Sequence, residues 1–302
     1  MMDPAIKEDL ANRFRALSAP MKREPTGETP VLKKLPNIRA VIFDFYGTLF
    51  ISGVGDIGVD DGASDTELML KALRATGVEI LSNKAGKRAF ELYKKYVTAE
   101  QQTLKASGIP YPEPDLRIVW RNVLNQLLAE ENISTATTNH HHVRMAVEFE
   151  ARMNPIWPMP DARETLQALS AKRLELGIIS NSQFYTPVAL EALLGETMEE
   201  LGFNRRLLHW SFEESRKKPS LPFYQSFAEK AQQMEPSIVP EQILFAGNDM
   251  LKDVWPAAKT GFKTALFAGD NRSLKWRRDD PRCTELQPDL VITELKQLVE
   301  CV

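Results

Sequence analysis

The sequence predicts an α/β protein with a doubly wound, mostly parallel sheet and an all-helical cap domain inserted after the first strand. Short apolar runs that end in polar residues alternate with helical patterns along the second half of the chain. One long helical stretch interrupts this alternation directly after the first apolar run. The chain has 302 residues, 43% of them hydrophobic, so it can bury a core and still carry a second domain.

Six segments have the pattern of short buried strands, since each is an apolar run bounded by polar or turn residues. They cover residues 39–44, 176–180, 206–210, 242–246, 263–267 and 289–292. Helical patterns lie between most of them, over residues 161–174, 186–201, 221–233 and 252–260. Asp161 and Glu164 have the spacing of a capping box. The alternation favours a parallel sheet with helices on both faces, whose ligands bind outside the carboxyl ends of the strands.

Residues 61–152 break the alternation, because their pattern is helical throughout except for a brief strand-like run at 77–81. Helices are predicted over 83–106, 113–130 and 139–153, and Ser64 and Glu67 again have capping-box spacing. We therefore interpret residues 53–155 as the cap, with the proline-rich segment 155–160 as a stiff hinge, and residues 38–52 and 156–302 as the core. Residues 1–37 form an N-terminal extension, with a helix over 4–17 and a linker over 19–30.

Charge and composition argue against several classes of partner. The formal net charge is −3, and the densest basic run, residues 275–282, is interrupted by Asp279 and Asp280, so we interpret it as a solvated loop and not a nucleic-acid site. No run of about 18 apolar residues exists, and the start lacks the apolar segment of a secretory signal. We expect a cytoplasmic protein with a small-molecule substrate and neither nucleic acid nor membrane as partner. The oligomeric state stays open.

Polar groups gather at the predicted strand ends. Asp44 ends the first strand, where its carboxylate points into the crevice, and Gly47 allows the backbone to turn behind it. Hydroxyl and amide groups at a strand end donate to anions, and a lysine before a proline is presented at a helix start. The other polar ends are Ser180 with Asn181, Lys218 before Pro219, and Asn248 with Asp249 and Asp253. One crevice thus combines an acid, a hydroxyl, an ammonium and further acids.

These residues resemble the four motifs of the haloacid dehalogenase (HAD) superfamily of hydrolases, in the family's order, over about residues 37–298. The helical insertion after the first motif resembles a C1-type cap. The motifs are Asp44-x-Tyr-Gly-Thr-Leu, Ser180-Asn181, Lys218-Pro219, and Gly247-Asn-Asp249 with Asp253.

The resemblance implies that Asp44 is a nucleophile that forms a covalent aspartyl intermediate, which water then hydrolyses. In a phosphatase of this family, Mg²⁺ would bind an oxygen of Asp44, the main-chain carbonyl of Tyr46 and an acid of the fourth motif. Asp249 is the first choice for that acid. The family pattern further implies that Thr48, Ser180 and the Asn181 amide hold phosphoryl oxygens, while Lys218 offsets the negative charge.

Two residues depart from the phosphatase pattern. Most phosphatases of the family have a second aspartate, the general acid, where this chain has Tyr46, and a phenol is a poor proton donor at neutral pH. Tyrosine at this point is typical of 2-haloacid dehalogenases, in which halide leaves without a proton. Many members have a metal-binding aspartate where this chain has Asn248, so the candidate metal ligands of the fourth motif are Asn248, Asp253 and, as first choice, Asp249.

The number of acids sets the order of the alternatives. Three converging carboxylates, from Asp44, Asp249 and Asp253, are costly unless a cation joins them, so we expect Mg²⁺. We rank a Mg²⁺-dependent phosphatase acting on a small phosphorylated metabolite first. A metal-independent 2-haloacid dehalogenase-like hydrolase comes second, and a degenerate, non-catalytic HAD-fold binding protein third. The physiological substrate is not determined by the sequence.

Two other patterns are set aside. Residues 53–58 match G-x-G-x-x-G, but they neither follow a strand directly nor open a helix, so a flexible connection is favoured over a dinucleotide site. Three consecutive histidines, residues 140–142, point about 100° apart on a helix and cannot all bind one ion.

Overall fold

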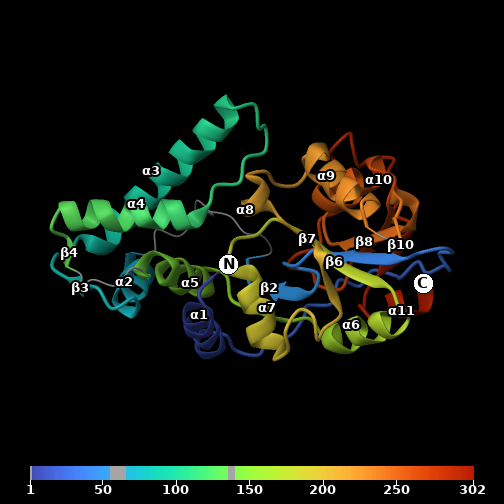
Figure 1. Ribbon diagram of the computed structural model, residues 1–302, viewed down its shortest axis with the longest axis horizontal. Coiled ribbons are helices and arrows are strands. Elements are labelled where there is room, and N and C mark those ends of the chain that lie inside the picture. Colours follow the sequence, from blue (N-terminus) through green and yellow to red (C-terminus); the bar gives the residue numbers. More distant parts are fainter. Residues whose placement is uncertain (1, 55–65, 135–139, 235) are drawn as a thin grey trace.

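The structure, a computed structural model, describes residues 2–54, 66–134, 140–234 and 236–302. In these residues the core contains one parallel sheet with the strand order β10-β9-β8-β1-β6-β7 (Figure 1). The predicted fold class is confirmed, and each of the predicted strands is present within a few residues. The strands are β1 (Ala40–Phe43), β6 (Glu175–Ser180), β7 (Phe203–Trp210), β8 (Ile243–Gly247), β9 (Lys263–Phe267) and β10 (Leu290–Ile292).

Helices cover both faces of the sheet because its strands are apolar on both sides. In the central strand β1, Val41 and Phe43 belong to one hydrophobic cluster and Ala40 and Ile42 to another. The first cluster includes residues of α6 (Ala162–Ala171), α7 (Thr186–Leu194) and α11 (Gln297–Cys301), and the second includes residues of α9 (Leu221–Gln232) and α10 (Trp255–Lys259). In Figure 1, α9 and α10 lie above the sheet and α6 and α11 below it.

The helical segment leaves and rejoins the core through a pair of short antiparallel strands, β2 (Phe50–Ser52) and β5 (Ile156–Pro158). Between them lie α2 (Thr66–Ala75), α3 (Ala85–Ala106), α4 (Leu116–Ala129) and α5 (His141–Met153), with β3 (Glu79–Ile80) paired to β4 (Ile133–Ser134). Stacked rings of Tyr93 and Trp120, 4.6 Å apart, form part of its core. The domain limits at 53 and 155 stay predictions.

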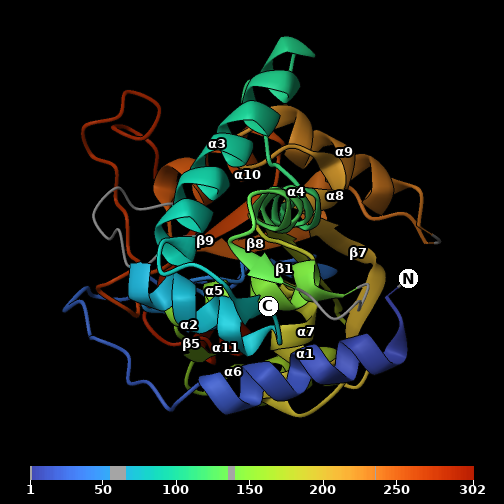
Figure 2. The same cartoon turned by 90° about the vertical axis from the view of Figure 1, so that its left-hand side faces the viewer.

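The N-terminal helix α1 (Pro4–Leu17) lies against both the core and the cap (Figure 2). Lys7 forms an ion pair with Glu191 of α7, while Arg13 forms one with Glu148 of cap helix α5. The chain then runs along the core, where Val31 pairs with the edge strand β10 through Val291. Within the predicted linker over 19–30, the hydroxyl of Thr26 donates to the carbonyl of Ala268 at 2.6 Å and Arg23 forms an ion pair with Glu294, so the linker contacts the core.

Some local predictions differ from the structure. Asp161 takes a left-handed conformation with φ of 60° and makes no side-chain cap, so the predicted capping box at α6 is wrong. The helix predicted from residue 252 begins earlier, as a π-helical turn (Met250–Val254) capped by Asp249, before α10 follows. The helix starts predicted at Ser64 and Asn139, and most of the glycine motif at 53–58, lie outside the described residues.

The remaining elements are short: α8 (Ser211–Glu214) after β7 and a 3₁₀ turn (Pro240–Gln242) before β8. None of the helices that the structure describes is long and apolar enough to cross a membrane.

Candidate active site

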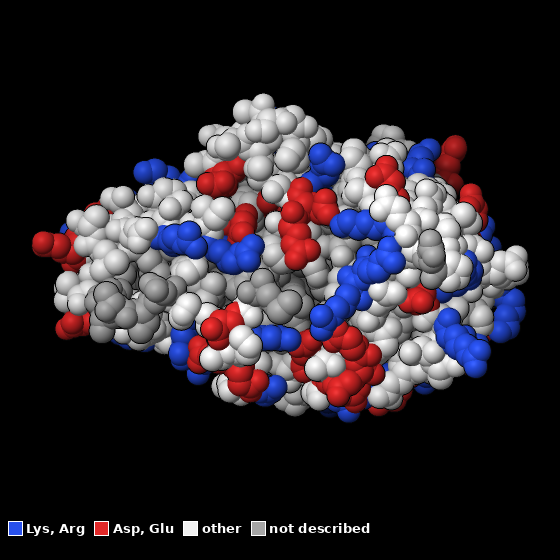
Figure 3. Space-filling model, in the orientation of Figure 1, with Lys and Arg blue, Asp and Glu red and all other residues white. Residues whose placement is uncertain are grey.

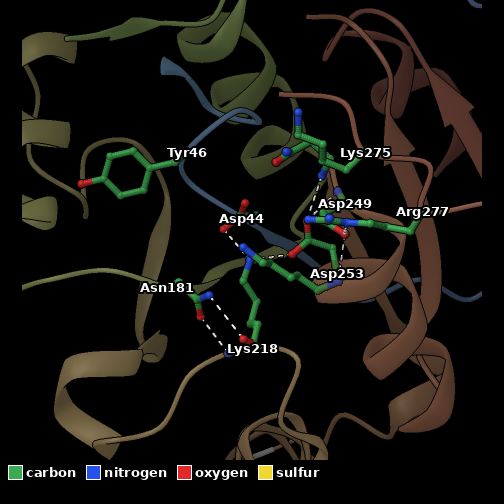
Figure 4. Close-up of a pocket in the computed structure, with 10 residues that line it drawn as sticks. Asp44, Tyr46, Asn181, Lys218, Asp249, Asp253, Lys275 and Arg277 are labelled. Atoms are coloured by element: carbon green, nitrogen blue, oxygen red, sulfur yellow. Dashed lines mark hydrogen bonds and ion pairs between the residues drawn. The ribbon is translucent and has the colours of Figure 1, made fainter. Parts of the chain in front are cut away.

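Asp44, Lys218 and Asp253 form a buried line of charges at the carboxyl ends of the strands (Figure 4). Asp44 follows β1 directly, and its Oδ1 lies 2.6 Å from the Nζ of Lys218. The same Nζ lies 2.5 Å from Oδ1 of Asp253, which comes from the π-helical turn after β8. One ammonium group therefore neutralises part of the charge of two carboxylates, as the strand-end pattern leads us to expect.

Burial and mutual charge act against each other in this group. Burial alone would lower the pKa of Lys218, but the carboxylates of Asp253 and Asp44 outweigh it and raise that pKa above the usual value for lysine. Lys218 therefore remains a cation. Burial raises the pKa of Asp253, and the negative charges of Asp44 and Asp249 act in the same direction, while Lys218 opposes them.

Asp253 also organises the backbone around it. Its Oδ2 accepts the main-chain N–H groups of Asn248 and Asp249, at 3.0 and 2.9 Å. Gly247 is required at the end of β8, because a Cβ there would lie 2.4 Å from Cγ of Asp253. Both carboxylate oxygens of Asp253 are thus occupied by protein groups.

Asp249 is held by an arginine that lies far away in the sequence. Its Oδ2 accepts from Nη2 of Arg277 at 2.7 Å, and the Nε of Arg277 lies 3.2 Å from both carboxylate oxygens. Oδ1 of Asp249 also caps the following turn, accepting from the N–H groups of Leu251 and Lys252 at 2.8 and 3.1 Å. The acid that the sequence favours as metal ligand is therefore saturated by this chain's own donors.

Asn248 and Thr48 brace the loops around the site. The hydroxyl of Thr48 donates to Oδ1 of Asn248 at 3.1 Å, and Nδ2 of Asn248 donates to the main-chain oxygen of Ser273 at 2.7 Å. Gly47, with φ of 84°, permits this contact, because a Cβ there would lie 2.5 Å from the Cβ of Ser273. These side chains join the loops after β1, β8 and β9.

Asn181 holds the main chain of Lys218. Its Oδ1 accepts from the N–H of Lys218 at 2.7 Å, and its Nδ2 lies 3.5 Å from the carbonyl oxygen of the same residue. Ser180 is fully buried at the end of β6, with its hydroxyl 3.3 Å from the carbonyl oxygen of Asn181. The side chain of Asn181 thus positions the ammonium, while the expected phosphoryl contacts of Ser180 and Asn181 stay predictions.

Tyr46 is turned away from the nucleophile (Figure 4). Its hydroxyl lies 3.0 Å from Oγ1 of Thr186, at the start of α7. Burial raises the pKa of this phenol well above its usual value, although the hydrogen bond to Thr186 acts in the opposite direction. In this arrangement the hydroxyl of Tyr46 is directed at Thr186 and not at a group that leaves the substrate beside Asp44.

Three cations at this site were missed in the sequence: Lys252, Lys275 and Arg277. They line a cavity of about 40 Å³ together with Asp44, Tyr46, Asn181, Lys218, Asn248, Asp249 and Asp253. The predicted solvated loop over 275–282 is wrong at its start, because Lys275 pairs with Asp249 as an isolated parallel bridge and brings the loop to the site. The strand-end rule that identified Asp44 would have found this loop had it been applied to β9, because β9 is the neighbour of β8 in the sheet.

The oxygen atoms of the fourth motif that were predicted to bind Mg²⁺ are not available to the ion in this arrangement. The oxygens of the fourth motif are occupied by protein groups: Asp249 and Asp253 are saturated by protein donors, and the oxygen of Asn248 accepts from Thr48. Since Mg²⁺ takes one or two carboxylates and keeps several waters, it would have to displace Arg277 to bind Asp249. Within the described ranges, no three histidine, cysteine, aspartate or glutamate side chains are grouped to hold a metal. The premise that the three carboxylates need a metal also fails, since Lys218 and Arg277 already pair with them.

The family follows from a comparison of the whole sequence. A sequence model of the haloacid dehalogenase-like hydrolases matches residues 38–261, which is more than half of the chain. The chain belongs to the haloacid dehalogenase-like hydrolase family. The match confirms the resemblance that the four motifs indicated. This chain is therefore a HAD-like hydrolase.

Solved structures agree with this fold. The HAD-like chain is similar to a 2-haloacid dehalogenase from Pseudomonas syringae pv. tomato DC3000, with 17% identity, a TM-score of 0.50, and coverage of 87% of this chain and 97% of that one. It is also similar to a HAD phosphatase from Thermococcus onnurineus, with 16% identity, a TM-score of 0.49, and coverage of 87% and 97%. The search of curated proteins gave no match. The likeness to the dehalogenase structure shows the fold alone.

Proposed function

We propose that this chain is a hydrolase in which Asp44 displaces a leaving group that departs without a proton, as in a metal-independent 2-haloacid dehalogenase. The observation that carries the proposal is the orientation of Tyr46, whose hydroxyl contacts Thr186 instead of the reacting centre. A leaving group with a basic oxygen needs a general acid, whereas halide does not. The proposal therefore reverses the order favoured by the sequence alone.

The first step uses Asp44 and Lys218. The Asp44 carboxylate attacks the carbon that bears the halogen, forming a C–O bond while the carbon–halogen bond breaks and halide leaves with the electron pair. Lys218, 2.6 Å from Oδ1, orients the carboxylate. Because Lys218 also contacts Asp253, its Nζ is fixed from both sides and needs no rearrangement during attack.

The second step releases the product. Water attacks Cγ of the Asp44 ester, the bond between this carbon and the substrate oxygen breaks, and the 2-hydroxy acid and one proton are released. Attack through Oδ2 of Asp44 in the first step leaves Oδ1 as the carbonyl oxygen of the ester, so the negative charge that develops on Oδ1 lies beside the ammonium of Lys218, which stabilises it electrostatically. Asp44 is regenerated with one oxygen taken from water.

The second candidate is the Mg²⁺-dependent phosphatase. It is favoured by the fact that Asp44, Asp249 and Asp253 line one cavity. In this case Arg277 would have to leave Asp249 before a metal could bind there.

The test is to measure chloride release from 2-chloropropionate and phosphate release from p-nitrophenyl phosphate, each with EDTA and with Mg²⁺. We expect chloride release in EDTA, and its loss in Asp44→Asn, while the exposed control Asp279→Asn keeps the wild-type rate. Phosphate release that requires Mg²⁺, without chloride release, would establish the second candidate. Neither activity would indicate a non-catalytic member of the family.

A further inference from the structure

The segment between α3 and α4 of the cap pairs with the chain directly before Lys218. The N–H of Lys217 donates to the carbonyl of Tyr111 at 2.9 Å, and the N–H of Glu113 donates to the carbonyl of Ser215 at 3.0 Å. An antiparallel bridge joins the two residues that these bonds enclose. Figure 1 shows this segment passing beside α8. The cap therefore holds the main chain of the residue that precedes the ammonium of the active site.

Gln183 joins the same cap segment to the loop after β6. Its side chain is 1% exposed, and it lies two residues after Asn181. Its Oε1 accepts the N–H of Leu116, the first residue of α4, at 3.0 Å. Its Nε2 donates to the carbonyl of Pro114 at 2.9 Å and to Oε1 of Glu113 at 3.1 Å. A buried amide without partners is costly, so these bonds stabilise the cap segment in this one position.

Glu113 links the amide of Gln183 to the chain after β7. Its Oε2 lies 3.1 Å from the hydroxyl of Ser211, which is fully buried and accepts the N–H of Ser182 at 2.8 Å. The residue before Ser182 is Asn181, which accepts the N–H of Lys218 at 2.7 Å (Figure 4). A series of hydrogen bonds thus connects the cap to the side chain that holds Lys218.

Exposed charges surround this junction, but they align it less well than the buried bonds. Figure 3 shows acidic and basic side chains together over the middle of this face, where the helical segment meets the core. Exposed ion pairs contribute little, because water screens them and long side chains keep several conformations. The buried amide of Gln183, in contrast, holds two main chains in one register. The alignment of the cap with Lys218 therefore depends on Gln183 and Glu113.

We propose that Gln183 and Glu113 are positioning residues. They fasten the cap to the loop of Lys218 and so keep its ammonium beside Asp44. In the part of the chain that the structure describes, neither side chain lines the cavity at Asp44, so both act through Lys218 and not on the substrate. Lys218 lies 2.6 Å from Asp44, and a displacement of about 1 Å can reduce turnover about 100-fold. The inference rests on the proposed function for its turnover assay alone.

The first measurement is chloride release from 2-chloropropionate in EDTA. We expect kcat to fall about 10- to 100-fold in Gln183→Ala, with KM changed less than about threefold, because the ammonium is misplaced while the cavity keeps its lining. Glu113→Gln keeps one oxygen acceptor and should fall between this variant and the wild type. The control is Gln167→Ala, which removes an exposed glutamine of α6 and should keep the wild-type kcat.

The second measurement needs no turnover. Hydrogen exchange followed by mass spectrometry reports on the amides of Lys217 and Lys218, which donate to the cap and to Asn181. We expect these amides to exchange about tenfold faster in Gln183→Ala than in the wild type, which corresponds to the loss of about one hydrogen bond. Gln167→Ala should exchange at the wild-type rate.

The outcomes separate this inference from the proposed function. The inference is overturned if Gln183→Ala, shown to be folded by its thermal unfolding curve, has the wild-type kcat, or if its KM alone changes. Equal exchange of the amides at 217–218 in Gln183→Ala and Gln167→Ala also overturns it. If Gln183→Ala does not fold, Glu113→Gln decides by the same two measurements. If the wild type releases no chloride, the proposed function fails and the exchange rates alone decide the inference.

Discussion

Glu148 connects the N-terminal helix to the cap through a fully buried carboxylate, and its replacement should lower stability markedly. Its side chain is 0% exposed and lies against Arg13 of α1 and against Arg144 and Arg152 of its own helix. Removing one member of a buried ion pair typically costs about 3–5 kcal/mol. We expect Glu148→Ala to cost about 3 kcal/mol, at the lower end, because the three arginines are between 17% and 33% exposed and can be hydrated.

The assay is urea and thermal unfolding at pH 7. A loss of about 3 kcal/mol corresponds to a fall in Tm of roughly 6–12 °C in a domain of this size. Glu148→Gln, which keeps the shape of the side chain, separates charge from packing and should lose nearly as much. The control is Glu67→Ala, whose pair with Lys71 is exposed and contributes about 0.5 kcal/mol at most. A Glu148→Ala variant as stable as this control would refute the importance of the buried network.

Three other changes have defined outcomes. In Arg277→Gln, Asp249 loses its partner, so Mn²⁺ binding measured by electron paramagnetic resonance should become stronger than in the wild type; equal affinities would show that the ion pair does not exclude metal. Gly47→Ala should lower the free energy of unfolding by roughly 1–3 kcal/mol, because its Cβ would collide with Ser273 and its φ is positive, and an unchanged urea midpoint would contradict this. Burial lowers the pKa of His209 to about 4. The unfolded chain therefore binds more protons than the folded chain between about pH 4 and 6.5, so the free energy of unfolding falls by up to about 3 kcal/mol as the pH is lowered through this window. In His209→Gln this fall should be smaller, as measured by urea unfolding at several pH values.

The sheet and the meeting of Asp44 with Lys218 were predictable because both depend on local patterns. Apolar runs determine where the strands lie, and parallel strands bring their carboxyl ends to one edge. The side chains of Asp44 and Lys218 lie 2.6 Å apart at that edge, as the spacing of the motifs leads us to expect.

The partners of each side chain were not predictable, because they depend on contacts between distant loops. Tyr46 turns toward Thr186, and Asp249 pairs with Arg277, which lies 28 positions further along the chain. A count of acids in the motifs suggests a metal, but it omits cations from loops that belong to no motif. The capping box at Asp161 failed for a related reason, since the left-handed backbone there turns the side chain away from the helix N–H groups.

The contact of Val31 with β10 has a consequence for self-association. An edge strand exposes unpaired N–H and C=O groups, to which a strand of another molecule can add. Here the N–H of Val31 donates to the carbonyl of Val291 at 2.8 Å, and the N–H of Val291 donates back at 3.0 Å, so these groups are already occupied. At the opposite edge, β7 carries the charged residues Arg205 and Arg206, both exposed. Each border of the sheet is thus protected against strand addition, one by the chain's own N-terminal segment and the other by positive charge.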